Sequence, residues 1–503
     1  MKPRILSCVT AMTLLAALAL PIRLAAQHQN AQQRAHPRYR LVDIGTFGGG
    51  QSAVFEFFRT LTKGGTLVGV AETSTPDPNY PNFSPLIGFG NPDPFIQHAF
   101  QWRNGVLTDL GALINSSQSV AVNGKGVTAG VSENGLIDPL NGLLAVHAVV
   151  WQDDQIIDLG TLGGGYESTA NDINNRGQVV GASLNQIPDP FGFGGVQLRA
   201  FIWQNGAMQD LGTLGTGNDA VASLTNERGQ VTGWSYTNST ANPVTLIPTQ
   251  HPYLWENGRM LDLGSLGGTA GAPNALNNRG EVAGLSNLAG DTTAHPFRWS
   301  EAEGMKDLGT LGGTFGDAFW INEAGEVVGL ASLPGDEVWH AFLWKDGVTT
   351  DLGTLKGDPL SVALGVNSKG QVVGNSGTPS AIRGFLWENG AMFDLNTLVS
   401  PGSKLNLFFP SIINDRGEIA GQGQLPNGDI HAFLLIPCEG DHAGEGGCED
   451  APEATNATIQ DSPLPANQSS TNMPPSSLTP IEIEARMRGR FGPNRGFAAI
   501  PRK

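Results

Sequence analysis

Aspartate and histidine recur along this chain at nearly fixed intervals, and both residue types can bind metals or transfer protons. The aspartate begins an Asp-Leu-Gly segment in most copies, and the histidine opens a His-Ala-Phe triplet in three of them. An enzyme assembles one active site, so one chemistry repeated in every copy points to a structural role. We expect the aspartate to accept hydrogen bonds from backbone N–H groups or from a third-strand side chain such as the tryptophan indole. We expect the histidine to tie the third strand to a neighbour. The recurring aspartates are Asp43, Asp109, Asp158, Asp210, Asp262, Asp307, Asp351 and Asp394.

These aspartates mark a sequence repeat of about 50 residues, a period found in propeller blades. Each copy also holds an Asn-x-x-Gly turn, a short strand that ends in glycine, and a segment that ends in tryptophan. Every element is present eight times, with Thr62 replacing the turn asparagine in the first copy and Leu435 replacing the tryptophan in the last. The turn asparagines are Asn123, Asn174, Asn226, Asn277, Asn322, Asn367 and Asn414.

Each copy is expected to hold four short strands. In the copy at 158–206, Asn205-Gly206 favours a type I′ hairpin turn between the third and fourth strands. Evenly spaced strands with glycine-rich turns predict an all-β fold, an eight-bladed β-propeller with seven blades as the fallback. The Phe-x-Trp pairs of the third strands should pack between blades. The strands expected in this copy are Thr169–Asn174, Gln178–Gly181, Arg199–Trp203 and Ala207–Leu211.

The two ends of the repeat region are complementary. Tyr39–Ile44 resembles a fourth strand with no strands before it, and the last copy, Ser411–Ile436, has three strands and no fourth. We expect Tyr39–Ile44 to pair beside His431–Ile436, which closes the ring and removes its open edges. An open β-solenoid is the structural alternative.

Two repeated motifs carry a family resemblance. They are the triplets His98-Ala-Phe, His340-Ala-Phe and His431-Ala-Phe and the Asp-Leu-Gly-Thr-Leu-Gly-Gly runs at 158–164 and 307–313. With them the chain resembles the bacterial HAF-repeat proteins from Tyr39 to Pro437. The resemblance implies an extracellular repeat protein. It brings no catalytic residues, so the activity stays open.

The segments flanking the repeats predict export. Residues 1–26 combine Lys2 and Arg4 with an apolar run and a small residue at Ala26, which is typical of a secretory signal peptide. A polar linker, 27–38, precedes the propeller at 39–437. No later segment is apolar for the length of a transmembrane helix. We therefore expect an extracellular or periplasmic protein without a membrane span.

Residues 438–503 should form a disulfide loop and a tail. Cys438 and Cys448 are expected to pair in an exported chain. The alternative is a metal pair with His442, which lacks a clear fourth ligand. Glu449–Thr479 is rich in Pro, Ser, Asn and Thr, and we expect it to be disordered because it has little apolar surface to bury.

The composition limits the classes of partner. The chain of 503 residues has a formal net charge of −17, which argues against nucleic acid and anionic membranes, because both attract basic surfaces. No metal or cofactor is predicted, although calcium at Asp-rich loops stays open. We expect a monomer.

Binding residues are expected where the copies differ, in the loops between second and third strands. These loops are long in the first four copies, and the first three contain Asp-Pro at Asp93, Asp138 and Asp189. Loops on a rigid scaffold are common binding sites. The alternative is that their aromatic residues cap the blade ends and the prolines stiffen the loops. The candidate binding residues are Tyr80, Phe83, Phe95, Phe191, Phe193, Trp234, Tyr236 and Trp339.

Two functions remain in view. The first is an exported, non-enzymatic binding or scaffold propeller that recognises a glycan, a peptide or an envelope partner through this loop face. The alternative is a secreted polysaccharide hydrolase or lyase with a central site on the same face. No nucleophile elbow, His-Glu-x-x-His or phosphate loop is present, so no catalytic residue is predicted. The acids of the loops, scattered in the sequence, are Asp77, Asp93, Asp189 and Asp336.

Overall fold

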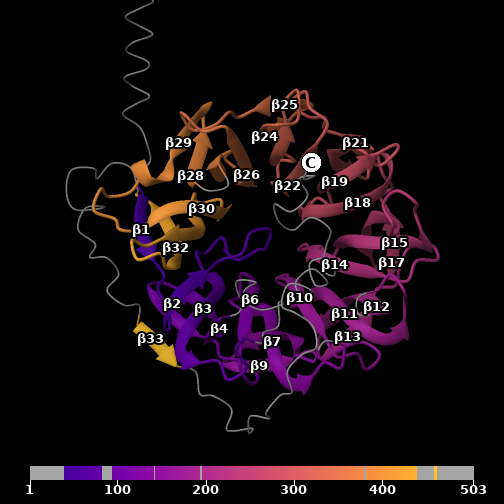
Figure 1. The fold of residues 1–503 in the computed structure, drawn as a ribbon, viewed down its shortest axis with the longest axis horizontal. Coiled ribbons are helices and arrows are strands. Elements are labelled where there is room, and N and C mark those ends of the chain that lie inside the picture. The colour runs from indigo at the N-terminus through magenta and orange to yellow at the C-terminus, as the bar shows by residue number, and fades with distance from the viewer. Residues whose placement is uncertain are drawn as a thin grey trace, which may run out of the picture.

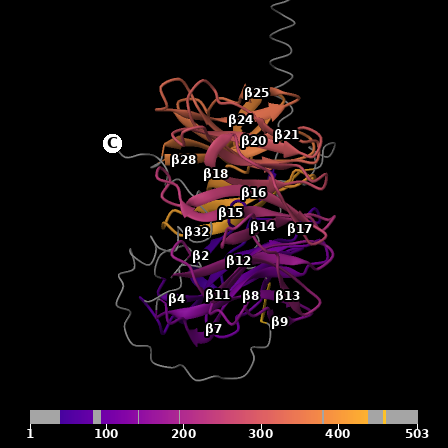
Figure 2. The same cartoon turned by 90° about the vertical axis from the view of Figure 1, so that its right-hand side faces the viewer.

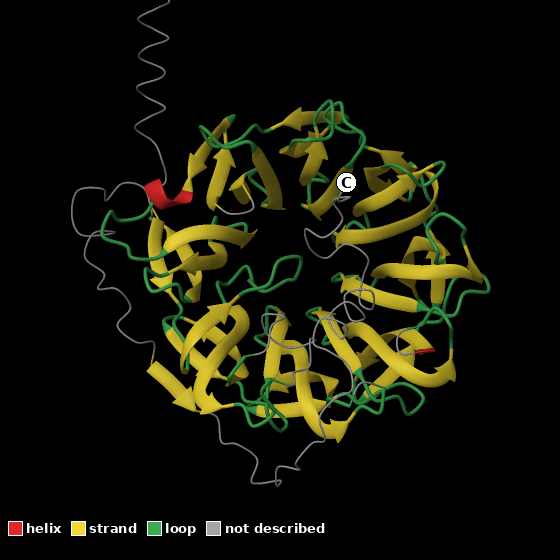
Figure 3. Ribbon diagram, viewed as in Figure 1, coloured by secondary structure: helices red, strands yellow, loops and turns green. Residues whose placement is uncertain are grey.

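The computed structural model describes residues 39–81, 93–140, 142–192, 195–378, 381–438 and 458–461. Within these ranges the regular structure is almost entirely β, with one short 3-10 turn, η2 (Leu395–Thr397). Figure 3 shows strands and loops making up nearly the whole ribbon. The predicted signal peptide 1–26, the linker 27–38 and most of the C-terminal tail lie outside the described residues.

The strands follow one another in groups of four, which we call units and number in chain order. Unit one is β2 (Gly48–Ala53), β3 (Leu67–Pro76), β4 (Phe95–Arg103) and β5 (Val106–Asp109). Unit two is β6 (Ser117–Val122), β7 (Thr128–Ile137), β8 (Leu144–Gln152) and β9 (Gln155–Asp158). Unit three is β10 (Ser168–Ile173), β11 (Val179–Pro188), β12 (Val196–Gln204) and β13 (Ala207–Asp210). Unit four is β14 (Ala220–Thr225), β15 (Val231–Ala241), β16 (Pro248–Glu256) and β17 (Arg259–Asp262).

The second half of the chain repeats the pattern. Unit five is β18 (Gly267–Leu276), β19 (Val282–Leu288), β20 (Ala294–Ser300) and β21 (Gly304–Asp307). Unit six is β22 (Gly316–Ile321), β23 (Val327–Ser332), β24 (Trp339–Lys345) and β25 (Val348–Asp351). Unit seven is β26 (Leu360–Val366), β27 (Val372–Thr378), β28 (Ala381–Glu388) and β29 (Ala391–Asp394). Unit eight is β30 (Asn406–Ile413), β31 (Ile419–Gln424) and β32 (Ile430–Pro437), joined by β1 (Tyr39–Asp43).

The units surround a central axis, with their first strands innermost and their fourth strands outermost (Figure 1). Figure 2 shows the same arrangement edge on. The described strands form seven hydrogen-bonded sheets, because one parallel bridge between Gln250 and Ala270 joins units four and five into a single sheet. Four-stranded antiparallel sheets arranged in this way make the chain a β-propeller.

Local structure in unit three agrees with the sequence prediction. Asn205 and Gly206 have φ angles of 53° and 83°, as a type I′ turn requires. The second strand is longer than predicted and runs on from Gly181 to Pro188. Glycine is required at position 181, because a Cβ there would lie 1.8 Å from the carbonyl oxygen of Thr169. The aromatic ring of Phe201 occupies the space above that glycine.

The Phe-x-Trp pairs of the third strands lie in the core as predicted. The phenylalanines are completely buried and the tryptophans are buried or nearly so, which places one aromatic cluster between successive units. The buried phenylalanines are Phe100, Phe201, Phe297, Phe342, Phe385 and Phe433.

The first and last units meet along several contacts. β1 pairs antiparallel with β32, with Tyr39 opposite Pro437 and Asp43 opposite Phe433. The backbone N–H of Ala432 in unit eight donates to the hydroxyl of Ser52 in unit one at 3.0 Å. N-terminal and C-terminal strands therefore belong to one sheet, as the complementarity of their sequences indicates.

Part of the tail departs from the sequence prediction. Disorder was expected throughout Glu449–Thr479, but Thr458–Asp461 forms strand β33, paired parallel with β5. The expectation of disorder is wrong there, because the outer edge of unit one offers backbone hydrogen-bonding groups that composition alone does not reveal.

A chain of asparagine amides joins the units near the axis. Each turn asparagine ends the first strand of its unit, and its Oδ1 accepts from backbone N–H groups of its own turn, as in Asn277, where the donors are Arg279 and Glu281 at 3.0 Å each. Its Nδ2 donates to the backbone carbonyl of the equivalent residue in the next unit. These links are Asn123 to Asn174, Asn174 to Asn226, Asn226 to Asn277, Asn277 to Asn322, Asn322 to Asn367, Asn367 to Asn414, and Asn414 to Thr62, at 2.9–3.1 Å.

Unit one interrupts this chain of amides. Thr62 has a hydroxyl that accepts from the N–H of Thr66 at 3.0 Å, as an asparagine Oδ1 does, but it has no amide to donate onward. Units one and two are joined instead by a backbone bond, in which the carbonyl of Arg59 accepts from the N–H of Val122 at 3.2 Å. The buried asparagines therefore hold both the shape of each turn and its distance to the next unit.

Replacing Asn277 with alanine should destabilise the protein by about 1–3 kcal/mol, because buried donors and acceptors lose their partner. The matched control is Asn278→Ala in the same turn, since Asn278 is exposed and its side chain bonds at the surface, donating to Glu323 and accepting from the N–H of Glu227. Its cost should stay within about 0.5 kcal/mol. Chemical denaturation measures both, and equal costs for the two variants would contradict a structural role for the buried amide.

Candidate functional site

The recurring histidines and aspartates bond to each other within six of the eight units. The histidine lies near the start of the third strand, and its Nδ1 bonds to the aspartate that ends the fourth strand, at 2.8–3.0 Å. Units three and seven use Arg199 and Arg383 in the same position. The His–Asp pairs are His98–Asp109, His147–Asp158, His251–Asp262, His295–Asp307, His340–Asp351 and His431–Asp43.

The same aspartates also cap the link to the next unit. Asp158 Oδ1 accepts from the N–H of Gly160 at 2.8 Å, and the equivalent bond recurs in the other Asp-x-Gly segments. Burial raises the pKa of Asp158, but hydrogen bonds from His147 and Gly160 outweigh it and lower that pKa. The predicted backbone donors are confirmed, whereas the third-strand donor is histidine or arginine rather than the tryptophan indole. These ionisable residues thus serve the scaffold.

The acids of the Asp-Pro pairs shape their own loops. Oδ1 of Asp93, Asp138 and Asp189 accepts from the N–H two residues further on, at 2.8, 2.8 and 2.7 Å. This is the geometry of an Asx turn, in which an aspartate side chain imitates a backbone turn. The loop conformation therefore accounts for these three acids.

The two other loop acids are engaged in the same way. Asp77 accepts from the N–H of Asn79 at 2.8 Å and from Nδ2 of Asn115 at 3.1 Å. Asp336 accepts from the N–H and hydroxyl of Thr314 and from the hydroxyl of Ser332. None of the four scattered acids is brought to another in a central pocket by these contacts.

Three carboxyl groups near strand ends in the first half of the chain have raised pKa values. Burial raises the pKa of Glu72 to about 7, with a hydrogen bond to Asp93 acting in the same direction. Burial likewise raises the pKa of Glu133 to about 7. Asp219 is 1 % exposed, and burial followed by the nearby Asp189 charge raises its pKa to about 7.

The predicted binding aromatics fall into different environments. Tyr80 is 53 % exposed, whereas Phe95, Phe191 and Trp339 are half-buried. Trp234 and Tyr236 are buried, with ring centroids 5.3 Å apart, and they pack on the aliphatic core of units three and four. They are therefore not available as an exposed platform, and including them was wrong. Phe83 and Phe193 lie outside the described residues, as does Cys448, while Cys438 is disulfide-bonded.

An apolar surface that the sequence prediction missed gathers at the same end of the units. The loops between second and third strands, and the links from each fourth strand to the next unit, lie at one end of every antiparallel group; we call this end the loop face. Nine of the eleven exposed large apolar residues in the described ranges lie on it, mostly in units one to four. They are Tyr80, Ile114, Leu136, Ile137, Tyr166, Ile187, Val244, Leu246 and Phe315. Their position at strand ends was the available signal.

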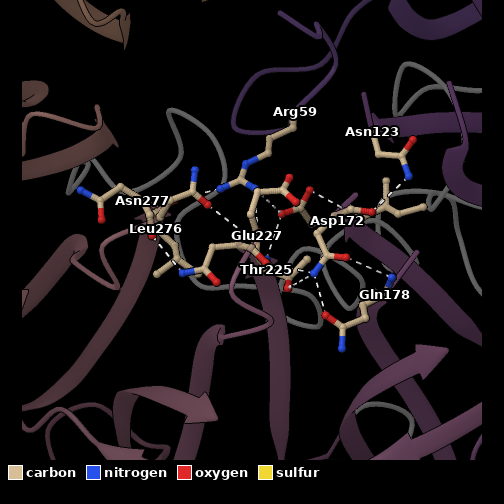
Figure 4. Close-up of polar contacts among 12 residues, drawn as sticks. Arg59, Asn123, Asp172, Gln178, Thr225, Glu227, Leu276 and Asn277 are labelled. Carbon is tan, nitrogen blue, oxygen red and sulfur yellow. Dashed lines mark hydrogen bonds and ion pairs between the residues drawn. The ribbon is translucent and has the colours of Figure 1, made fainter. Parts of the chain in front are cut away.

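A loop of unit one extends into the centre of the ring of units. This plug, residues 54–60, follows β2 and reaches the first strands of other units (Figure 1). The Arg59 guanidinium donates to the carbonyls of Thr225 at 2.6 Å and Leu276 at 2.8 Å, and it lies 3.4 Å from the carboxylate of Asp172. Figure 4 shows this arginine among the polar groups of units three to five. The ring of Phe57 packs on Phe319, at 5.0 Å between centroids.

The described residues contain no preformed metal cluster and one small cavity that merits description. A small cavity of about 190 Å³ lies on the opposite end of units five and six, between Arg298, Glu326, Trp344 and Lys345. Its charged groups already pair, with Lys345 on Glu326 at 2.7 Å and Arg298 on Glu281 at 2.5 Å. The described ranges hold no group of three or more His, Cys, Asp or Glu side chains placed to bind a metal. They also contain no helix with the length and apolarity to span a bilayer.

The solved structures similar to this chain share little sequence with it. It shares 12 % identity with the β-propeller domain of the Trilobed protease from Pyrococcus furiosus, over 69 % of this chain and 96 % of that one, with a TM-score of 0.40. TolB from Acinetobacter baumannii gives 10 % identity over 58 % and 76 %, with a TM-score of 0.30. A gluconolactonase from Xanthomonas campestris gives 12 % over 52 % and 82 %, with a TM-score of 0.26.

No family model matches the chain, and no curated protein matches it. At these identities and TM-scores, the structural likenesses do not indicate what this chain binds.

The buried carboxyl group of Asp219 should make folding stability fall as the pH rises. With a pKa of 3.8 unfolded and about 7 folded, it holds more proton in the folded state between those values, so the unfolding free energy decreases with pH there and levels off above about 7. Each pH unit is worth at most about 1.4 kcal/mol. Asp219→Asn should remove this part of the slope and be more stable than the wild type at pH 8.

Denaturant unfolding at pH 5, 6, 7 and 8 measures that slope. The control is Asp153→Asn, because Asp153 is exposed in a hairpin turn. If Asp219→Asn has the same slope as the control, the proposed titration of Asp219 is wrong.

Replacing Arg59 with methionine should destabilise the protein by about 3–5 kcal/mol, because the carboxylate of Asp172 is then left buried without its cation. Adding Asp172→Asn should recover part of this loss, and a double-mutant cycle gives the coupling between the two residues. Arg228→Met is the control, since the Arg228 side chain is 50 % exposed. Equal stability of Arg59→Met and the control would refute the anchoring role of the plug.

Proposed function

We propose that this chain is an exported, non-enzymatic binding protein of the HAF-repeat type, an eight-bladed propeller closed between its first and last units. The pairing of β1 with β32 supports closure. So do the link from Asn414 to Thr62 and the ion pair of Lys63 with Asp415 at 2.9 Å. An extracellular or periplasmic location follows from the sequence of residues 1–26.

The observation that carries a binding function is the distribution of exposed apolar side chains. Nine of eleven lie on the loop face, and the four units with long loops hold eight of those nine. Apolar groups gathered on one face, with polar residues engaged in the scaffold around them, are typical of an interaction surface.

We propose that the partner is a protein or peptide rather than a glycan. Six of the nine exposed residues are aliphatic, and Trp234 and Tyr236 are buried. Aliphatic side chains gain by burial against other apolar groups. A sugar would need convergent hydrogen-bonding groups, and the loop carboxylates already bond to their own backbone.

The hydrolase or lyase alternative has a feature in its favour, the hydrogen-bonded carboxyl groups of Glu72 and Asp93. Glu72 also accepts from the backbone N–H groups of Gly50 and Gln51, which makes it part of the scaffold. Such an enzyme requires an acid paired with a nucleophile or base around a substrate pocket. Asp77 and Asp93 lie in one loop of unit one, whereas Asp189 and Asp336 lie in units three and six, and all four acids hold loop conformations. Binding is therefore the function that the geometry supports better.

A charge placed in the apolar surface should abolish partner binding. The variant carries Leu136→Glu, Ile187→Glu and Leu246→Glu, one change in each of units two, three and four. The full chain is applied to a peptide array and to a glycan array. We expect peptide binding that falls at least tenfold in this variant, because each buried carboxylate would lose its hydration.

The matched control carries Leu261→Glu and Val348→Glu, which are 39 % and 61 % exposed but lie on fourth strands away from the loop face. It should bind peptides as the wild type does. Equal binding by the triple variant would reject the loop face as the site, and binding to glycans alone would reject the class of partner.

A further inference from the structure

The outer strand of unit one carries a fifth strand. β33 (Thr458–Asp461) pairs parallel with β5 (Val106–Asp109), with Thr458 opposite Val106 and Asp461 opposite Asp109. The yellow strand lies beside the first unit in Figure 1. The remaining fourth strands of the described units end their sheets without such an addition. One edge of this propeller is therefore extended by a segment far away in the sequence.

The sequence of the edge does not explain the choice of unit one. β5 reads Val-Leu-Thr-Asp and β25 of unit six reads Val-Thr-Thr-Asp, yet β25 has no added strand. Val348 at the start of β25 is 61 % exposed, while Val106 at the same place in β5 is half-buried. A second property must distinguish the two edges.

Position distinguishes them. The chain leaves the propeller at the end of β32 (Ile430–Pro437) in unit eight, and unit eight contacts unit one through Ala432 and Ser52. Residues 438–457 connect β32 to β33, which is twenty residues and at most about 66 Å when extended. The outer strand of unit eight is β1, which pairs on one side with β32. The next outer edge along the ring is β5.

We propose that the β5 edge is a strand-addition site whose ligand is the chain's own segment Thr458–Asp461, so that the C-terminal segment is latched onto unit one. Backbone hydrogen bonds provide most of the recognition in such additions, and they tolerate many side chains. The latch covers an edge that would otherwise be free to pair with another chain. This site is separate from the loop face and does not depend on the proposed binding function.

A cysteine pair tests the register and the choice of edge. Thr108 lies opposite Gln460, so the full chain carrying Thr108→Cys and Gln460→Cys should form an intramolecular disulfide, identified by mass spectrometry of the linked peptides. The matched control carries Thr350→Cys with Gln460→Cys, because Thr350 occupies the same place in β25. It should remain unlinked.

The outcomes of this experiment show whether the strand on β5 comes from the same chain or from a second copy. A link in both pairs, or in neither, would overturn the assignment of the segment to β5. A covalent dimer from the first pair would show that the strand comes from a second copy of the chain, and it would overturn the intramolecular latch.

Hydrogen exchange tests the same contact without cysteines. The variant with Ile459→Pro and Gln460→Pro lacks two consecutive backbone N–H groups, so its segment cannot pair on either side. Exchange at the β5 amides that face away from β4 should become at least tenfold faster. Ser470→Pro, outside β33, is the control and should exchange as the wild type does; unchanged exchange in the double variant would overturn the proposal.

A labelled peptide of residues 456–463 extends the test to binding. It should bind the Ile459→Pro/Gln460→Pro variant saturably and leave the wild type unlabelled, because the wild-type edge is occupied. Further substitution of Asp109→Pro in that variant removes an N–H that faces away from β4, and it should reduce peptide binding at least tenfold. If this last substitution leaves peptide binding unchanged, the peptide binds elsewhere and the β5 edge is rejected as the site.

Discussion

The whole arrangement depends on one buried amide in each of seven turns near the axis. An asparagine at the end of the first strand uses its oxygen to shape its own turn and its nitrogen to bond to the next unit. A shorter or apolar side chain cannot do both, because the two functions need an acceptor and a donor on opposite sides of one planar group. The recurrence of asparagine in seven of eight turns therefore reflects a geometric requirement of the ring and not a shared chemistry.

A second set of repeated residues has the corresponding role at the outside of each unit. Histidine or arginine on the third strand bonds to the aspartate that ends the fourth, and that aspartate also fixes the glycine of the link. Histidine and aspartate often signal catalysis, but here they form hydrogen bonds that hold the units in shape. The units differ from one another mainly at the strand ends on the loop face, where long loops and exposed apolar side chains occur together. That division makes a binding surface the more economical interpretation of the molecule.

Much of the fold was predictable because its determinants are local and repeat. The turn at Asn205-Gly206, the Phe-x-Trp core and the backbone role of the Asp-x-Gly aspartates follow from short patterns that recur in most copies. Contacts between distant segments left no such pattern. Arg59 gave no sign that its partners would be the carbonyls of Thr225 and Leu276. Nor did the composition around Thr458 indicate that a neighbouring edge would order it.

The candidate site was less predictable than the fold for a related reason. Exposure depends on how a loop folds back on its own unit, and Trp234 and Tyr236 precede such a loop on a strand whose inner face is covered. Their aromatic character suggested a surface role, whereas packing on units three and four buried them. The isolated aliphatic residues at strand ends, such as Leu136 and Ile187, carry no motif, and only the fold reveals that they lie on the same face.

The plug and the β1 strand also fix the order in which the molecule can be completed. Residues 39–60 leave the ribosome before every other described part of the chain, yet their partners lie in units three to five and in β32, the last strand of the ring to be synthesised. The earliest segment must therefore wait for the latest one. A chain that finishes folding only when its far end arrives stays incomplete throughout synthesis, with its first strand unpaired until β32 is made.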